Sequence, residues 1–156
     1  MKGFRRGEGD LITARFNAGE AAAIAGLAKE LAGRLSDGDD PAVARLFPDA
    51  YPDDEEASAE FRRFTVDSLT DAKIENARLV VRSLAASGHA RVTVELDPGA
   101  AQSWLRALTD IRLVMASQLG IEHDGDTGFR GGPGNRRNAL VYAWLGYVQE
   151  SLIQSL

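Results

Sequence analysis

Apolar residues recur at every third or fourth position over most of this chain, a spacing typical of helices that bury one face. Capping residues mark several starts: Asn17 has Glu20 three residues later, and Asp40 and Asp97 are each followed by proline. The pattern predicts a bundle of about five helices. The helical segments lie near residues 18–37, 41–47, 57–69, 71–85, 98–119 and 139–152. Thr70 and Asn138 are predicted as further caps, and Gly38, Gly88 and Gly120 as the residues at which helices end.

Two segments alternate apolar and polar residues instead, which is the pattern of a half-buried strand. Residues 91–96 alternate regularly, and residues 4–16 are predicted to form a hairpin because Gly7-Glu8-Gly9-Asp10 supplies turn residues. A single short strand is not stable alone, so we expect residues 91–96 to pair with the hairpin in a small three-stranded antiparallel sheet. The predicted fold class is therefore α+β, mainly α.

The composition is that of an ordinary globular domain. The 156 residues include 44% apolar and 26% charged side chains and show no internal repeat, so we expect a single domain over residues 1–156. The chain has no cysteine, which excludes a disulfide framework, a thiolate metal site, a cysteine nucleophile and a thiol redox switch. No apolar run approaches the roughly 20 residues that cross a bilayer, and the N-terminus lacks the apolar segment of a secretory signal. We expect a cytoplasmic protein with no membrane contact.

The net charge of −5 disfavours tight binding to DNA. Proteins that hold DNA by its phosphates usually gather Lys and Arg on one basic face. Here the basic residues are scattered in small clusters along the chain. We therefore expect weak, salt-sensitive and non-specific DNA binding at most.

Two polar segments have features of a phosphate or metal site. Residues 128–138 are rich in glycine and carry three arginines ahead of a helix, whose free N–H groups favour anions, but they lack the Gly-Lys-Ser/Thr ending of a P-loop. Residues 122–126 place His123 among carboxylates, but a calcium loop needs a longer pattern with a terminal Glu. A solvated loop and a polar turn are the simpler interpretations, and His89, after Gly88, fits a helix-capping role. We predict no metal and no cofactor.

Asp110 and Arg112 stand in an otherwise apolar helical segment. Arg106 lies one turn before Asp110, so an ion pair at four-residue spacing explains the acid structurally, and a polar spot that faces a partner is the alternative. No Ser or Thr lies in the context of a nucleophile elbow or a triad, so we do not expect an enzyme. Aromatic residues at helical spacing are mostly core, although Tyr and Trp are also common in interfaces; those on the last two long helices are Trp104, Tyr142, Trp144 and Tyr147.

The final helical segment carries more apolar surface than one inward face needs. Leu140, Tyr147 and Ile153 fall off the face that we expect to be buried. Contiguous exposed apolar patches tend to mark contacts. We therefore hypothesise a homodimer or partner interface on this helix, formed by Tyr147 and Ile153 with Arg136 and Arg137 nearby.

Short motifs along nearly the whole chain resemble those of one family. They are residues 41–51 (PAVARLFPDAY), 61–63 (FRR), 71–73 (DAK), 94–96 (VEL), 101–105 (AQSWL), 109–113 (TDIRL), 142–145 (YAWL) and 149–150 (QE). Together they resemble the actinobacterial domain-of-unknown-function 2017 family, which is typically encoded beside the ClpS adaptor and has some members known as oxidative-stress transcriptional regulators. The motifs are not catalytic signatures; they mark Trp104, Asp110, Arg112, Tyr142 and Trp144 as structural family residues.

The resemblance implies a transcriptional regulatory protein that acts under oxidative stress. Because this sequence has no cysteine, it cannot sense oxidants through a cysteine pair and must be informed of the stress by another protein. Its acidity favours a protein partner, such as a sigma factor or RNA polymerase, over DNA. The alternative implied by the family is an interaction or adaptor protein of the Clp proteolytic system.

Overall fold

The computed structural model describes residues 3–38, 40–47, 55–85, 91–121 and 133–156, and for residues 55, 57, 58, 61–65, 133 and 134 it describes the backbone alone. The described part of the chain is mainly helical, with one three-stranded antiparallel sheet, which confirms the predicted fold class. The elements in chain order are β1 (Arg5–Arg6), β2 (Ile12–Phe16), α1 (Ala18–Asp37), the 3-10 helix η1 (Pro41–Leu46), α2 (Glu55–Ser83), β3 (Val92–Leu96), α3 (Pro98–Leu119) and α4 (Pro133–Ser155).

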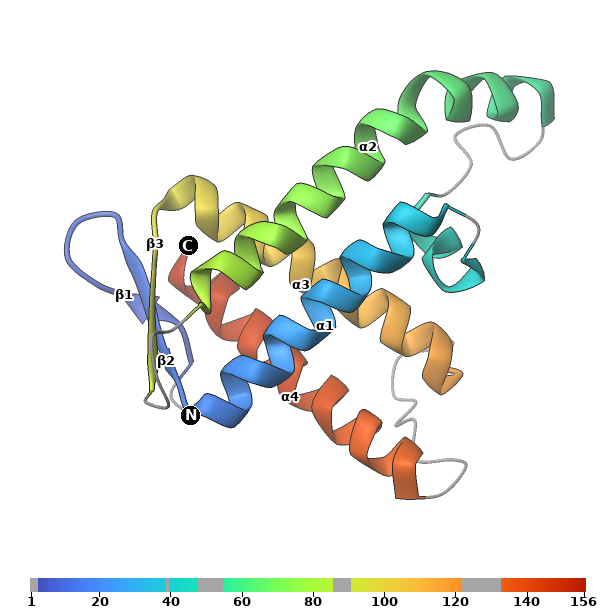
Figure 1. The fold of residues 1–156 in the computed structure, drawn as a ribbon. Coiled ribbons are helices and arrows are strands. Elements are labelled where there is room, and N and C mark those ends of the chain that lie inside the picture. The colour runs from blue at the N-terminus through green and yellow to red at the C-terminus, as the bar shows by residue number, and fades with distance from the viewer. Residues whose placement is uncertain (1–2, 39, 48–54, 86–90, 122–132) are drawn as a thin grey trace.

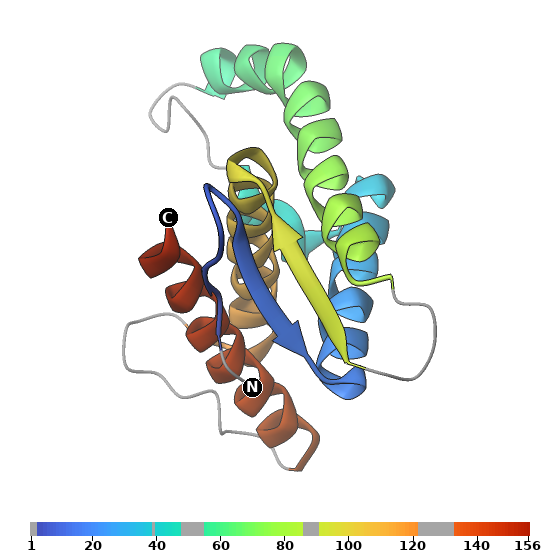
Figure 2. The same ribbon diagram turned by 90° about the vertical axis from the view of Figure 1, so that its left-hand side faces the viewer.

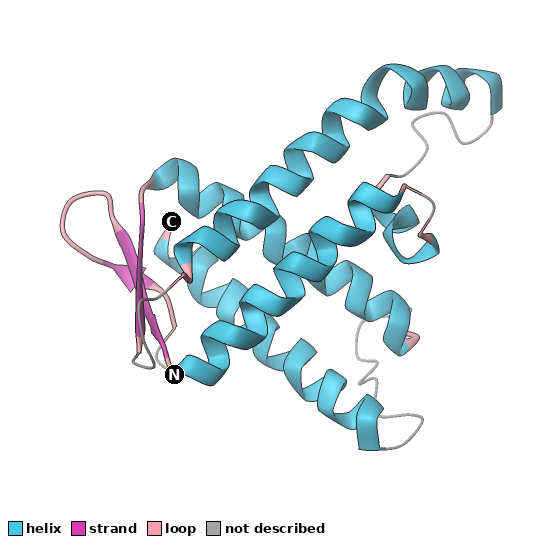
Figure 3. Cartoon of the chain, viewed as in Figure 1, coloured by secondary structure: helices cyan, strands magenta, loops and turns pink. Residues whose placement is uncertain are grey.

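The helices form two antiparallel pairs that cross one another. Helices α1 and α2 lie side by side, and α3 and α4 form the second pair behind them (Figure 1). The sheet lies at one end of this arrangement, beside the start of α1 and the end of α4 (Figure 3). None of the described helices combines the length and the hydrophobicity needed to cross a bilayer.

The sheet has the strand order β1-β2-β3, as the sequence predicts for a hairpin joined by residues 91–96. Strand β2 pairs with β3 in a register that sets Phe16 opposite Val92 and Ile12 opposite Leu96. Alternate side chains of both strands are buried against the helices, so the sheet has one apolar face and one outer polar face.

The predicted caps of α1 and α3 are confirmed. Asn17 and Glu20 form a reciprocal capping box at the start of α1, and the Asp97 carboxylate accepts a hydrogen bond from Ala100 N at the start of α3. Gly38 and Gly120 end these helices with φ of 80° and 70°, a backbone conformation that a side chain would strain.

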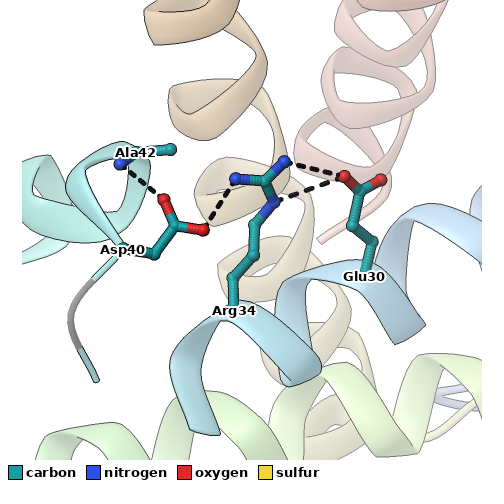
Figure 4. A network of polar contacts seen from close by, with 4 residues as sticks. All are labelled: Glu30, Arg34, Asp40 and Ala42. Atoms are coloured by element: carbon teal, nitrogen blue, oxygen red, sulfur yellow. Dashed lines mark hydrogen bonds and ion pairs between the residues drawn. The ribbon is translucent and has the colours of Figure 1, made fainter. Parts of the chain in front are cut away.

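A polar network ties the end of α1 to the start of η1 (Figure 4). Arg34 donates from Nη2 to Glu30 Oε1 at 3.0 Å and from Nη1 to Asp40 Oδ2 at 2.8 Å. The other oxygen of Asp40 accepts from Ala42 N at 2.8 Å and so caps η1. The hydrogen bond to Glu30 raises the pKa of Arg34 above its ordinary value, against the opposing effect of burial. The network links the last turns of α1 to the first residues of η1.

The break predicted at Thr70 is wrong. Residues 55–83 form one continuous helix, because no glycine or proline interrupts this stretch and threonine is tolerated inside a helix as well as at its cap. On the last turns of this helix Ala77, Val80 and Leu84 are buried, whereas Val81 is half-buried and Ala85 is exposed.

The predicted start of the final helix at Asn138 is wrong as well. Helix α4 begins at Pro133, a residue suited to the first turn because its missing N–H would have no partner there. Asn138 lies exposed within the helix. The last part of the predicted glycine-rich loop is therefore helical, and residues 128–132 lie outside the described part of the chain.

Candidate functional site

Trp104 lies at the centre of the core, where the sheet meets the helices. Its side chain has no exposed surface, and its ring packs edge-on against Phe4, with a centroid distance of 5.4 Å, and parallel to Phe16 at 6.1 Å. The indole N–H donates to Ser83 Oγ of α2 at 3.1 Å, so the one polar atom of the ring is satisfied. Trp104 therefore joins α3 to the hairpin and to α2, and its predicted role as a core residue is confirmed.

Asp110 of α3 pairs with Lys73 of α2. Lys73 Nζ lies 3.0 Å from Oδ1 and 3.1 Å from Oδ2 of the acid, whose side chain is only 6% exposed. The prediction that Arg106 neutralises Asp110 is wrong, because the acid faces α2 while Arg106 points into solvent. Burial raises the pKa of Asp110 above its ordinary value, although the hydrogen bond and the charge of Lys73 oppose this shift. The pair is a buried link between two helices.

Arg112 joins α3 to α4 through three residues on one face of α4. Its guanidinium lies over the ring of Tyr142 at 4.5 Å, and Nη1 donates to Gln149 Oε1 at 2.9 Å. Gln149 in turn donates to Thr109 Oγ1 at 2.6 Å. The guanidinium also lies against Gly146, where the Cβ of any larger residue would come within 3.0 Å of Nη2. Arg112 therefore holds α3 and α4 together, through contacts that the sequence pattern did not predict.

Gly146→Ala should leave the free energy of unfolding unchanged or lower it, even though alanine is the better helix former. At Gly26 of α1, which has open space around it, the same substitution should raise the free energy of unfolding by about 0.5–1 kcal/mol. At Gly146 the new methyl group presses on Arg112 and offsets that gain. Urea denaturation of both variants measures the difference, and an equal gain at the two positions would contradict the packing of Arg112 against α4.

The exposed apolar residues of α4 fall on two sides of the helix. Leu140, Tyr147 and Ile153 are 60%, 52% and 45% exposed, which confirms that they lie off the buried face. At about 100° per residue, Leu140 and Tyr147 lie within about 20° of each other around the helix axis. Ile153 lies about 120° from Tyr147 around the same axis. One flat contact can therefore cover Leu140 and Tyr147 but not Ile153, and the interface stays a prediction.

The two arginines that we expected near this surface differ in their positions. Both Arg136 and Arg137 are exposed in the first turns of α4. Arg136 shares the side of Leu140 and Tyr147, one turn before Leu140, whereas Arg137 points about 80° away from Tyr147. Arg136 is thus the arginine that borders the apolar pair.

The N-terminal segment lies along the last turns of α4, a contact that the sequence pattern did not predict. Phe4 N donates to Ser151 Oγ at 2.9 Å, and Ser155 Oγ donates to Phe4 O at 2.9 Å. Gly3 N donates to Tyr147 Oη at 3.3 Å. The signal in the sequence is a pair of serines four residues apart on an apolar helix, a spacing that places both hydroxyls on one side.

The remaining candidates lie outside the described residues. These are His89, the carboxylate-rich residues 122–126, and residues 128–132 of the glycine-rich segment. Within the described ranges, no three His, Asp or Glu side chains are grouped closely enough to hold a metal ion.

The whole chain matches one protein family. The family is described as "Domain of unknown function (DUF2017)", and its model covers residues 1–156. The chain belongs to this family. No solved structure matches it.

Relatives within mycobacteria carry a functional name. The proteins named "Oxidative stress regulator AosR" from Mycobacterium tuberculosis (strain ATCC 25618 / H37Rv) and Mycobacterium bovis are 32% identical over 130 residues, which are 73% of this chain and 57% of each relative. A relative from Mycobacterium leprae is 30% identical over 138 residues, 80% of this chain and 62% of that protein. This DUF2017 chain therefore spans about 60% of the length of the curated relatives it matches.

Proposed function

We propose that this chain is a transcriptional regulatory protein of the oxidative-stress type, which acts by binding a sigma factor or RNA polymerase rather than by catalysis. The names of its mycobacterial relatives support the biological role. The mode of action rests on one structural observation, the exposed apolar pair on α4.

That pair has the composition of a protein contact. Leu140 and Tyr147 are both more than half exposed and lie two turns apart on one side of α4, with Arg136 beside them. Tyrosine and arginine are enriched in protein interfaces, and a rigid helix presents them with little loss of conformational entropy. A partner that covers this side would remove the apolar surface from water.

The oxidant signal has to reach this chain through its partner. The 156 residues contain no cysteine, so no thiol here can be oxidised. Of the two methionines, Met115 is buried in the core. Regulation is then a change in the amount or state of the partner that this chain binds.

Affinity capture from the native cytosol, read by mass spectrometry, tests the proposal. We expect wild-type protein to enrich a sigma factor or RNA polymerase. Leu140→Ser combined with Tyr147→Ala should reduce that enrichment, while circular dichroism shows an unchanged fold. Ile153→Ser is the matched control, because it removes a similarly exposed apolar side chain from another side of the same helix.

Two outcomes would count against the proposal. Enrichment of ClpS or a Clp ATPase in place of the transcription machinery would favour the adaptor alternative. Equal loss of capture in the double variant and in the Ile153→Ser control would show that the apolar pair on α4 is not the contact.

A further inference from the structure

The outer face of the sheet is polar and open. In Figure 2 the strands lie in front of the helices and turn this face toward the viewer. Because Ile12, Ala14 and Phe16 point inward, the residues between them point outward, and β3 alternates in the same way. The outward side chains line a shallow depression of about 460 Å³; they are Arg5, Thr13, Arg15, Arg91, Thr93 and Glu95.

The three arginines of this face form a diagonal row, one on each strand or directly beside it. Arg5 of β1 lies opposite Thr13, and Arg15, two residues farther along β2, lies opposite Thr93. The same register, continued by one residue, sets Arg91 opposite Asn17, a further two residues along. Diagonal neighbours of this kind are about 7–8 Å apart in a sheet.

These arginines have no partner within the described part of the chain. All three are exposed, and none of their guanidinium groups forms a hydrogen bond or an ion pair there. Arg34 and Arg112, in contrast, are each held by neighbouring side chains. Glu95 adds one carboxylate to the face, and Glu20 at its rim is engaged in the cap of α1. The face is therefore locally positive in a chain whose net charge is −5.

We propose that this outer face binds an extended acidic segment of another protein. Side chains on one side of an extended chain repeat every 6.6–6.8 Å or so, which fits a row of arginines about 7–8 Å apart. The planar guanidinium fork matches the two oxygens of a carboxylate. Thr13 and Thr93, which lie between the arginines, supply hydroxyl groups that can bond the peptide backbone.

The same features disfavour single-stranded nucleic acid as the ligand. Sheets that bind single strands stack the bases on exposed aromatic rings. Here the aromatic residues of the sheet region, Phe4 and Phe16, are buried against Trp104.

Fluorescence anisotropy with the whole chain tests this proposal. The probe is a labelled synthetic peptide in which glutamate and threonine alternate, and the comparison peptide has lysine in place of every glutamate. We expect the acidic peptide to bind and the lysine peptide not to bind. Arg15→Gln combined with Arg91→Gln should weaken binding about tenfold, the effect of losing two exposed ion pairs.

The matched control is Arg78→Gln combined with Arg106→Gln, which removes the same charge from exposed positions on α2 and α3. This control should bind the acidic peptide within about twofold of wild type, because salt screens the effect of charges that lie far from the bound peptide. Equal weakening in the two double variants would overturn the proposal, as would tighter binding of a single-stranded oligonucleotide than of the peptide. Strand β1, which carries Arg5, lies beside the last turns of α4, where Tyr147 Oη accepts from Gly3 N at 3.3 Å. Leu140→Ser alone leaves that contact intact, so this single variant should keep peptide binding whatever the outcome of the capture experiment.

Discussion

Replacing Trp104 with alanine should lower the free energy of unfolding by about 3–5 kcal/mol, the usual loss when a large aromatic side chain leaves a closed core. Trp104 is fully buried and contacts both aromatic residues of the hairpin, so its loss opens a cavity where the sheet meets the helices. The substitution also removes the donor to Ser83 Oγ. A loss of this size is a large fraction of the stability of a domain of this length.

Urea denaturation followed by circular dichroism measures the effect. Trp144→Ala is the matched control, because Trp144 is only half-buried and packs at the border of the core. We expect the control to cost less than half as much as Trp104→Ala. Equal losses at the two positions would contradict the central place of Trp104 between the sheet and the helices.

Lys73→Met should cost about 3 kcal/mol at neutral pH, because it leaves a buried carboxylate without its partner. The Asp110 side chain is 6% exposed and both its oxygens accept from Lys73 Nζ. Methionine keeps most of the length and the apolar stem of lysine, so the loss reports mainly the missing charge rather than a cavity. Adding Asp110→Asn should restore part of the stability, since it removes the unpaired charge.

The pH dependence of this pair has a definite sign. Burial raises the pKa of Asp110, so the folded chain holds this proton more tightly than the unfolded chain does. The contribution of the group to stability is therefore fully present below about pH 4, the ordinary Asp value, and falls as the pH rises through the raised pKa. As the pH rises through this range, the wild-type protein should therefore lose stability relative to the Asp110→Asn variant. The cost of Lys73→Met should shrink at acidic pH, and a cost independent of pH would contradict the buried position of the acid.

The secondary structure was largely predictable because its signals are local. Asn17, Asp40 and Asp97 cap their helices within two or three residues of sequence, and the alternation of residues 91–96 needs no distant contact to be recognised. The failure at Thr70 has a local cause too, since threonine serves both as a cap and as an interior helix residue. Only packing on the rest of the chain distinguishes the two.

The contacts between helices and strands could not be predicted from the sequence. Asp110 has a basic residue four positions before it, but its partner is Lys73, 37 positions away on α2. The serines of α4 that hold the N-terminal segment act over more than 140 positions. The row of Arg5, Arg15 and Arg91 exists only once the register of three strands is known. Pairings of this kind depend on how the helices and strands meet in space.

Reconstituted transcription is the most direct test of the proposed regulatory role. The reaction contains purified RNA polymerase, the sigma factor that this chain captures, and a promoter that this sigma factor recognises. Adding wild-type protein should change the transcript yield in proportion to its concentration, Ile153→Ser should act like wild type, and Leu140→Ser combined with Tyr147→Ala should have a much smaller effect. Unchanged yield with the wild-type protein, or an equal effect of the double variant, would contradict a regulator that acts through the exposed face of α4.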